Sequence, residues 1–523
     1  MDKKILYTFL FGIFTISCFS QSISLDLTYG TNGYTDPVNI TTASNGGSVL
    51  MSDNKLIIGY TPSSPSNIHL KKYNTNGSVD TTFGTNGIVT FDNGLNTREL
   101  ISKIVLQNDG KILVVGKYYS DPGSLQNYDV FILRLNNNGT RDTTFGSNGF
   151  VFRNLGTNWD RVIDVSYDSD GNIYLLGIAG NSPFQTTYLL KYSSTGVLDT
   201  TFESSGVITL PLSGADFVSK IFVGANSILL GGVKTNTGNN IKEIYLEKRD
   251  LNGSYIQNFG NSGVKTITDL NYQLGVADFA YDGDSDSMFI LSDIFSIAGG
   301  VPAGLLLAKI AYSDGTFVNP FGNSGVITYS NVNLFSPTYS KLLLLPNQEL
   351  IVGGISRLND GNNQFEIIMS KFSMDSGIVD LNFGTSGLYR PVNSSLQENV
   401  ITGFFKLPNG EILLTATGYF ASVPDKVYSS KHKNAYTLSS ESLSLLNEVF
   451  LHPNPTHNIL NLDFDESQFR IKTIKIYNSL GMLISKDLNV TKSIDVSQLS
   501  SGVYFLEIIS SDNEKRIQKF VKN

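Results

Sequence analysis

The sequence predicts an all-β protein in which a seven-bladed β-propeller is followed by a small Ig-like β-sandwich, and three observations support this fold class. A short motif built on an aromatic residue and glycines recurs seven times along the 523 residues. Four apolar runs of strand length lie between successive copies, and none has a helical period. The 49 Gly, 32 Phe and 25 Tyr with only 16% charged residues indicate strands joined by tight turns, and they exclude a coiled coil or a disordered chain.

The N-terminus has the pattern of a secretory signal peptide over residues 1–20. Two lysines precede an apolar run at 5–16, and the small residues Cys18 and Ser20 stand third and first before the expected cleavage site. The run is too short to span a membrane as a helix. A lipoprotein signal acylated at Cys18 is the alternative, although Thr15 stands where an aliphatic residue is expected.

Composition also limits the partners and cofactors. The formal net charge is −8 and no basic run occurs, which argues against nucleic acid as a partner. One Cys and four His exclude a disulfide framework and leave little for zinc or haem, so no cofactor is expected. Beyond the signal peptide no stretch is long and apolar enough to cross a bilayer, so no transmembrane span is expected in the mature chain.

The repeated motif is clearest as DTTFGTNGIV at residues 80–89, and it returns as DTTFGSNGFV at 142–151 and DTTFESSGVI at 199–208. Three weaker copies follow, and an initial copy, DLTYGTNGY, begins at Asp26. The aromatic residues of the seven copies lie 54 to 62 residues apart, and we predict that they are the structural anchors of the repeat. These anchors are Tyr29, Phe83, Phe145, Phe202, Phe259, Phe321 and Phe383.

Each repeat unit predicts four strands. After the anchor comes a short apolar run, then two longer runs separated by a turn such as Asn108-Asp109-Gly110, and a fourth run leads into the next anchor. An Asp-Gly or Asn-Gly turn between apolar runs is a strong hairpin signal, because the turn needs positive φ. Four strands per unit without a helix describe a propeller blade, so residues 21–440 are predicted to form a propeller of seven units.

The anchor motif has a structural and a functional interpretation. In the first, Asp80 accepts hydrogen bonds from the following amides, Phe83 fills the space between neighbouring blades, and Gly84 and Gly87 supply positive φ or close backbone approach. In the second, the seven aromatic residues form a ring of binding side chains. Residues repeated in every blade are more often packing residues than a site, so the structural interpretation is favoured.

The D-x-x-F-G-x-x-G motif and the N-D-G-K-I-L-V-V-G hairpin resemble the delta-60 repeat family, also described as a β-propeller domain of unknown function. The resemblance covers about residues 25 to 440, with departures such as Tyr29 and Glu203 in single copies. Seven units suit a closed ring, which removes exposed sheet edges. An open ring, or one of six or eight blades, stays possible because the segment after Tyr419 is degenerate.

The composition changes near Ser439, and a linker is predicted at 441–448. Residues 449–523 then alternate in hydrophobicity between Asn-Ser-Leu-Gly and Ser-Ser-Gly turns, a pattern typical of a small β-sandwich. Four elements follow in order: a Pro-Asn-Pro turn, the run I-Y-N-S-L-G, the run L-S-S-G-V-Y-F-L, and a basic end. Their motif residues are Pro453, Asn454, Pro455, Gly481 and Gly502.

This ordered set resembles the type A sorting domain of the type IX secretion system of Bacteroidetes. The resemblance implies that the type IX secretion machinery exports the protein across the outer membrane and that its sorting peptidase removes the domain. The mature protein is then expected to be secreted or attached to the cell surface. A generic Ig-like binding module is the alternative.

Catalytic motifs are absent from the sequence: no G-x-S-x-G, H-E-x-x-H, P-loop or dinucleotide fingerprint occurs, so no catalytic residue is predicted. Asp282, Asp284, Asp286 and Asp293 imitate the spacing of a calcium loop, although Ser287 replaces the usual Gly. The favoured alternative is an expanded hairpin turn, because this segment aligns with the hairpins of the other units.

The sequence therefore favours a secreted or surface propeller that binds an extracellular glycan or protein, or that serves as a passive scaffold. A secreted glycan-active enzyme, a hydrolase or lyase, on the same scaffold is the alternative. An enzyme is expected to interrupt the repeat with long insertions that carry catalytic residues, whereas the spacing here varies by at most eight residues. Trp159 is expected either to fill an interface between blades or to stack on a sugar ring.

Overall fold

The computed structural model describes residues 23–434 and 450–523, except for the segments 41–45, 63–66, 93, 95–96, 121–126, 157–158, 181–184, 214–215, 332–333, 358–364, 392–396, 421–422, 464–470, 479–482, 488–491 and 511–514. The predicted signal peptide at 1–20 and the predicted linker at 441–448 lie outside the described residues. The chain forms two compact units, Met1–Ala435 and Tyr436–Asn523. Each unit has its own hydrophobic core.

Seven antiparallel sheets make up the described part of the first unit. Three of them are β3 (Gly47–Leu50), β4 (Leu56–Tyr60), β5 (Ile68–Tyr73) and β6 (Ile88–Phe91); β7 (Glu99–Leu106), β8 (Ile112–Tyr119), β9 (Tyr128–Leu135) and β10 (Phe150–Arg153); and β11 (Arg161–Tyr167), β12 (Ile173–Ala179), β13 (Thr186–Tyr192) and β14 (Val207–Ser213).

The next sheets are β15 (Phe217–Val223), β16 (Ser227–Thr235), β17 (Lys242–Asp250) and β18 (Val264–Ile267); β19 (Tyr272–Asp282), β20 (Ser287–Ser296), β21 (Pro302–Ala311) and β22 (Val326–Tyr329); and β23 (Phe335–Leu345), β24 (Glu349–Arg357) and β25 (Phe365–Ser373). The last sheet contains β26 (Gln397–Lys406), β27 (Ile412–Phe420) and β28 (Val423–Asn434), together with β1 (Ile23–Leu25) and β2 (Val38–Asn39).

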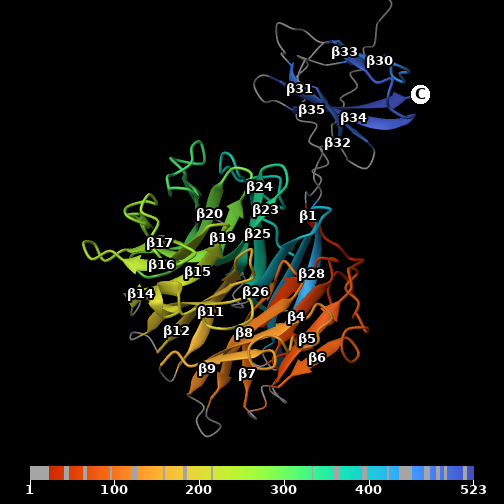
Figure 1. Cartoon of the computed structure of the whole chain (residues 1–523). Coiled ribbons are helices and arrows are strands. Elements are labelled where there is room, and N and C mark those ends of the chain that lie inside the picture. Colours follow the sequence, from red (N-terminus) through yellow and green to blue (C-terminus); the bar gives the residue numbers. More distant parts are fainter. Residues whose placement is uncertain are drawn as a thin grey trace, which may run out of the picture. The chain divides into compact units, whose positions relative to one another are not determined.

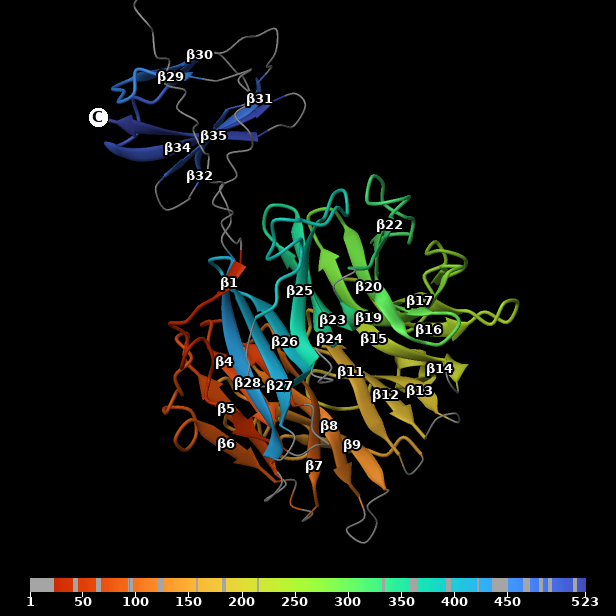
Figure 2. The same ribbon diagram turned by 180° about the vertical axis from the view of Figure 1, so that it is seen from behind.

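The sheets are arranged as the blades of a ring (Figure 1, Figure 2). Their first strands, β3, β7, β11, β15, β19, β23 and β26, contact one another in succession, and β26 also contacts β3, which closes the ring. Each blade packs both faces against its neighbours, and for that reason β9 buries all of its residues. The low charge of the sequence follows from this face-to-face packing. The predicted all-β propeller fold is confirmed.

No described residue belongs to an α-helix; the one helical turn in this part of the chain is the 3₁₀ turn η1 (Phe202–Ser204). The described residues therefore include no helix that could cross a membrane. The hairpin turns have the backbone that the sequence predicts, since Gly110, Gly171 and Gly410 have φ values of 82°, 78° and 81°.

The N-terminal strand completes the last blade. β1 pairs with β28, so that Ile23 lies opposite Asn434 and Leu25 opposite His432. Just after β1, Asp26 is 2% exposed, and its carboxylate oxygens form ion pairs with the Nζ atoms of Lys431 (2.7 Å) and Lys433 (3.1 Å). The two ends of the propeller chain are thus joined in one sheet, which leaves this blade without a free outer edge along β28.

His432 in β28 makes this closing sheet sensitive to acid. Its side chain is fully buried, and its ring nitrogens lie 3.2 Å from Tyr389 Oη and 2.9 Å from Ser430 Oγ. Burial lowers the pKa of His432 to about 3. An unfolded His has a pKa near 6.5, so below that pH the unfolded state binds the extra proton and is favoured over the folded one.

We expect the propeller to lose about 1.4 kcal/mol of unfolding free energy per pH unit between pH 6.5 and 3 because of His432 alone. His432→Gln should remove this part of the pH dependence, whatever its effect at pH 7.5. Urea unfolding of the full chain at pH 7.5 and pH 5.0 measures the difference, with the exposed His457→Gln as control. An equal loss in wild type and His432→Gln would contradict the assignment.

The second unit consists of two antiparallel sheets. One contains β29 (Phe450–His452), β30 (Ile459–Asp463) and β33 (Ser493–Asp495); the other contains β31 (Ile471–Asn478), β32 (Leu483–Asp487), β34 (Gly502–Ser510) and β35 (Lys515–Lys522). Leu460 and Leu462 of the first sheet share one buried cluster with Ile474, Leu506 and Phe520 of the second. Two sheets around one core form a sandwich, and its Ig-like character stays a prediction.

Candidate functional site

The seven predicted anchors all lie inside the propeller. Their exposed fractions are at most 3%, and Phe145, Phe259, Phe321 and Phe383 are completely buried. The aspartate of the motif stabilises the turn that precedes the anchor, as the sequence predicts. Asp80 accepts hydrogen bonds from the Thr82 amide (3.2 Å) and hydroxyl (2.6 Å). The anchors are therefore not available as a ring of ligand-binding aromatic side chains.

A buried or largely buried cation accompanies six of the anchors. In five pairs the cation lies on the strand before the motif, and for Tyr29 it lies on β28. The charged group is 4.4 to 5.8 Å from the centre of the aromatic ring, within the range of a cation–π interaction. The pairs are Lys72 with Phe83, Arg134 with Phe145, Lys191 with Phe202, Lys248 with Phe259, Lys371 with Phe383 and Lys431 with Tyr29.

The same cations connect each blade to the next. Lys191 donates to the Leu251 carbonyl (3.1 Å) and Lys248 to the Tyr312 carbonyl, each in the following blade. A turn glycine of the following blade closes over the anchor, because a Cβ on Gly139 would lie 2.5 Å from the ring of Phe83. The repeated motif, its cation and the neighbouring turn thus form one interface between blades.

The predicted calcium ligands are not brought together. Asp282 ends β19, and Asp284 and Asp286 lie in the turn that leads to β20. Asp282 accepts hydrogen bonds from Ser285 Oγ and the Asp284 amide. Asp293 lies further along β20, where it pairs with Gly275. The described residues contain no group of three or more metal-binding side chains, and the segment forms a hairpin turn.

Asp293 has a different environment from the turn aspartates. Its carboxylate accepts the Tyr339 amide of the next blade (2.6 Å), and burial raises its pKa to about 7. Trp159 is half-buried, with its ring 5.4 Å from that of Tyr128. Both residues therefore contribute to contacts within the propeller.

The Pro-Asn-Pro turn at 453–455 is exposed and is tied to the last strand of the second unit. Asn454 donates to the Lys519 carbonyl (3.0 Å) and accepts the Val521 amide (2.9 Å). Gly502 begins β34, whereas Gly481 lies outside the described residues. The motif thus fixes the start of this unit to its C-terminal strand.

Charged side chains alternate around the centre of the propeller. Each of the first strands from β7 to β23 has a β-bulge, and the residue after the bulge is charged. These residues are Lys103, Asp164, Lys220, Asp278 and Lys341, and they line one cavity of about 430 Å³, here called the central channel. A bulge redirects the side chain that follows it, which explains why otherwise apolar strands contribute charges at this level.

The alternation stops at the two remaining blades. β26 has the same bulge, but it is followed by Gly403, and β3 begins at Gly47. Hydroxyls replace the charges here: Ser48 Oγ and Thr402 Oγ1 lie 2.6 and 3.0 Å from Thr415 Oγ1. The wall of the central channel is therefore charged over five blades and neutral over two.

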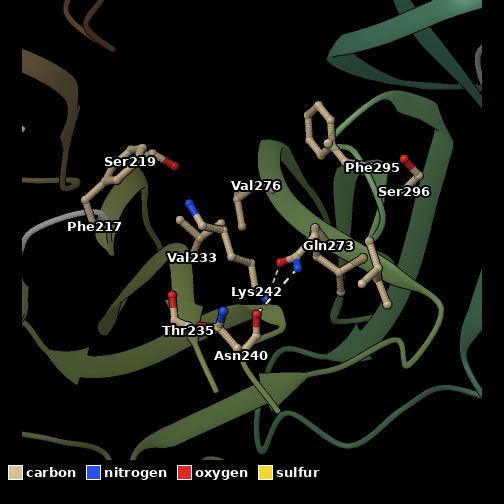
Figure 3. Close-up of a pocket in the computed structure, with 14 residues that line it drawn as sticks. Phe217, Ser219, Val233, Thr235, Asn240, Lys242, Gln273, Val276, Phe295 and Ser296 are labelled. Carbon is tan, nitrogen blue, oxygen red and sulfur yellow. Dashed lines mark hydrogen bonds between the residues drawn. The ribbon is translucent and has the colours of Figure 1, made fainter. Parts of the chain in front are cut away.

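A second cavity, the inter-blade pocket, has a volume of about 630 Å³ and lies between the blades of β15–β18 and β19–β22. Figure 3 shows Phe217 and Phe295 on opposite sides of it, with the side chain of Lys242 between them. Both phenylalanines and Lys242 are half-buried. Lys242 Nζ forms no ion pair within the described residues.

The floor of the inter-blade pocket is held by hydrogen bonds. Gln273 accepts the Lys242 amide (2.6 Å) and donates to the Asn240 carbonyl (3.5 Å), which links the two blades (Figure 3). Asp216 accepts both the amide (2.9 Å) and the hydroxyl (2.7 Å) of Thr235. The pocket is therefore preformed rather than dependent on a ligand for its shape.

Neither cavity was predicted from the sequence. The inter-blade pocket combines residues of two repeat units that have no common motif. The charged residues of the central channel do have a sequence signal. Each is a charged residue within a short apolar run, as in ISKIVL and VSKIFV, and each lies 18 to 20 residues after the anchor that precedes it. Aligning the units on the anchors would have placed these charges at one level of the propeller.

Two family descriptions match the chain. Residues 450–523 match the secretion system C-terminal sorting domain, and residues 52–83, 107–145 and 169–202 match a β-propeller domain of unknown function, DUF5122. No curated protein matches the chain.

Several solved structures are similar in fold, with low identity. Polysaccharide lyase Uly1 is 10% identical with a TM-score of 0.47, covering 78% of this chain and 93% of that one. The β-propeller domain of the Trilobed protease from Pyrococcus furiosus is 7% identical (TM-score 0.37, covering 76% and 92%). An α-L-arabinanase from Penicillium chrysogenum, complexed with arabinobiose, is 10% identical (TM-score 0.38, covering 76% and 98%).

Proposed function

We propose that the propeller binds an extracellular glycan that contains an acidic sugar. The chain joins a DUF5122 β-propeller region to a secretion system C-terminal sorting domain, and it is therefore secreted or displayed at the cell surface. The ligand occupies the inter-blade pocket. The observation that carries this proposal is a single lysine placed between two phenylalanine walls. The sorting domain implies export through the type IX secretion machinery.

The chemistry of the inter-blade pocket supports this class of ligand. A sugar ring has apolar C–H faces and a rim of hydroxyls, so Phe217 and Phe295 can pack on its faces. Asn240 and Ser219 can hydrogen-bond to its hydroxyls. Lys242, which forms no ion pair within the described residues, can pair with a carboxylate or sulfate group of the ligand.

Binding rather than catalysis is supported by the composition of the pocket wall. No Asp, Glu or His lines the inter-blade pocket in the described part of the chain, whereas most glycosidases need two carboxylates beside the scissile bond. The buried carboxyl of Asp293 belongs to one of the two blades, but it accepts the Tyr339 amide of the blade beyond and does not line the pocket.

A glycan array that contains acidic and neutral oligosaccharides, followed by calorimetry with the best ligand, tests the proposal on the full chain. We expect Phe295→Ala to weaken binding about tenfold or more, since it removes one wall of the pocket. Lys242→Met should weaken binding of the acidic glycan about tenfold and leave its neutral analogue unaffected.

The matched controls are Phe152→Ala and Lys234→Met, which remove an exposed phenylalanine of another blade and an exposed lysine that does not line the pocket. Both should bind the glycan like the wild type. Wild-type affinity in Phe295→Ala and Lys242→Met, or binding of a protein partner with no glycan bound on the array, would contradict the proposal.

A further inference from the structure

The two carboxylates of the central channel already have partners. Asp164 is 7% exposed; it pairs with Lys103 and accepts the Ile221 amide of the next blade (3.1 Å). Asp278 lies 3.8 Å from Lys220 and accepts the Leu342 amide of its next blade (3.0 Å). Each carboxylate therefore joins two neighbouring blades and compensates one lysine.

Lys341 is the third lysine of the series and has no carboxylate of its own. It forms no ion pair within the described residues, and the positions that continue the ring beyond it are Gly403 and Gly47. Three lysines and two aspartates give this level of the channel an excess of one positive charge. Because the site is partly enclosed, this charge is screened less than a surface charge.

The wall next to the unpaired charge, formed by β26 and β3, carries hydroxyl groups. Ser48 and Thr402 line the same cavity as Lys341, and each hydroxyl is within hydrogen-bond distance of Thr415 Oγ1. The hydroxyls occupy the place of a side chain at this level, since a Cβ on Gly403 would lie 2.0 Å from Ser48 Oγ. The channel is also open to solvent, since the side chain of Lys103 is 41% exposed and that of Lys220 is 24% exposed.

We propose that the central channel binds a small oxyanion, sulfate or phosphate, free or as a monoester, with Lys341 as its principal ligand. The hydroxyl of Thr402 is a further donor, because it can accept from Thr415 and keep its own proton for the anion. An excess cation beside neutral donors and an empty volume is the arrangement that an oxyanion complements. Burial lowers the pKa of Lys341 to about 8, as expected for an amine that lacks a counterion. This site is separate from the inter-blade pocket and does not depend on the proposed glycan.

Calorimetric titration of the full chain with sodium sulfate, sodium phosphate and a sulfated monosaccharide, at low ionic strength, tests the proposal. We expect Lys341→Met to weaken oxyanion binding at least tenfold, because it removes the charge-assisted partner. The exposed Lys234→Met should not change the affinity. Binding of the inorganic ions alone identifies a free ion, and binding of the monoester as well identifies a larger anionic ligand; both results support the site.

Asp278→Asn is a second variant that tests the proposal even if Lys341→Met folds poorly. The asparagine oxygen can still accept the Leu342 amide, but the channel gains one positive charge, so we expect oxyanion binding to tighten about threefold or more. A loss of stability cannot produce tighter binding. The proposal is overturned if the wild type binds none of the three anions, if Lys341→Met binds like the wild type, or if Asp278→Asn binds more weakly.

Discussion

Replacing Phe145 with alanine is expected to lower the free energy of unfolding of the propeller by about 3 to 5 kcal/mol. The ring is fully buried, the Arg134 guanidinium lies 4.4 Å from its centre, and the Gly196 turn of the next blade packs against it. Removing the ring leaves a cavity between two blades and a buried cation without its aromatic partner. Urea unfolding followed by tryptophan fluorescence measures this loss, because the single tryptophan, Trp159, belongs to the propeller.

Phe152→Ala is the matched control, since Phe152 is 38% exposed and stacks on Phe150 at the edge of β10. We expect it to cost less than half as much, because much less apolar surface leaves water when this ring packs. Equal losses of unfolding free energy in Phe145→Ala and Phe152→Ala would contradict the role of the anchors in packing neighbouring blades together.

The second large effect is expected at Asp26, in the sheet that closes the ring. Asp26→Asn should destabilise the propeller by about 2 to 3 kcal/mol, because the buried side chain loses its charge-assisted hydrogen bonds to Lys431 and Lys433. The loss is limited because Lys431 keeps Glu411 (3.3 Å) and Lys433 is 51% exposed. Burial alone would raise the pKa of Asp26, but hydrogen bonds from Lys431, Thr28 and Lys433 hold it well below its usual value. This stabilisation is present above about pH 4 and decreases as acid protonates the folded carboxylate.

Urea unfolding measures the loss at Asp26, and limited proteolysis near residue 23 reports whether β1 has separated from β28. The control is Asp53→Asn, because Asp53 is 50% exposed and lies 3.8 Å from Lys72. Exposed ion pairs contribute about 0 to 1 kcal/mol, so this variant should unfold nearly like the wild type. A stable Asp26→Asn variant with a protected N-terminus would contradict the role of this residue in ring closure.

The repeat made the propeller predictable from the sequence. Hairpin turns such as Asp109-Gly110 and anchors such as Phe83 obey local rules, since one residue type satisfies each turn or packing site. The four runs of a unit predicted the number of strands in a blade but not its limits, because the short run after each anchor, such as Ile88–Phe91, completes the preceding blade. The pairing of β1 with β28 was less accessible, because strand identity alone does not reveal which distant strand completes a sheet.

The two cavities could not be predicted in the same way. The inter-blade pocket depends on Phe217 and Phe295, which come from different units and meet only because their blades are neighbours. The central channel depends on bulges that turn Lys341 and its counterparts inward, and a bulge has no fixed sequence signature. Asp293 has the spacing of a calcium loop, but it lies on β20 beyond the turn, which agrees with the hairpin that the sequence favours.

The joining of β1 to β28 also determines when the propeller can finish folding. Tyr29 and Ser429, whose hydroxyls lie 2.8 Å apart, are separated by 400 positions in the chain. Contacts between such distant residues form slowly, because the entropy of closing a long loop opposes them. During synthesis the first strand has no partner until the last blade has been made. A chain cut short anywhere before residue 423 therefore exposes two strand edges, which makes unfinished molecules easy targets for proteases and mature ones resistant.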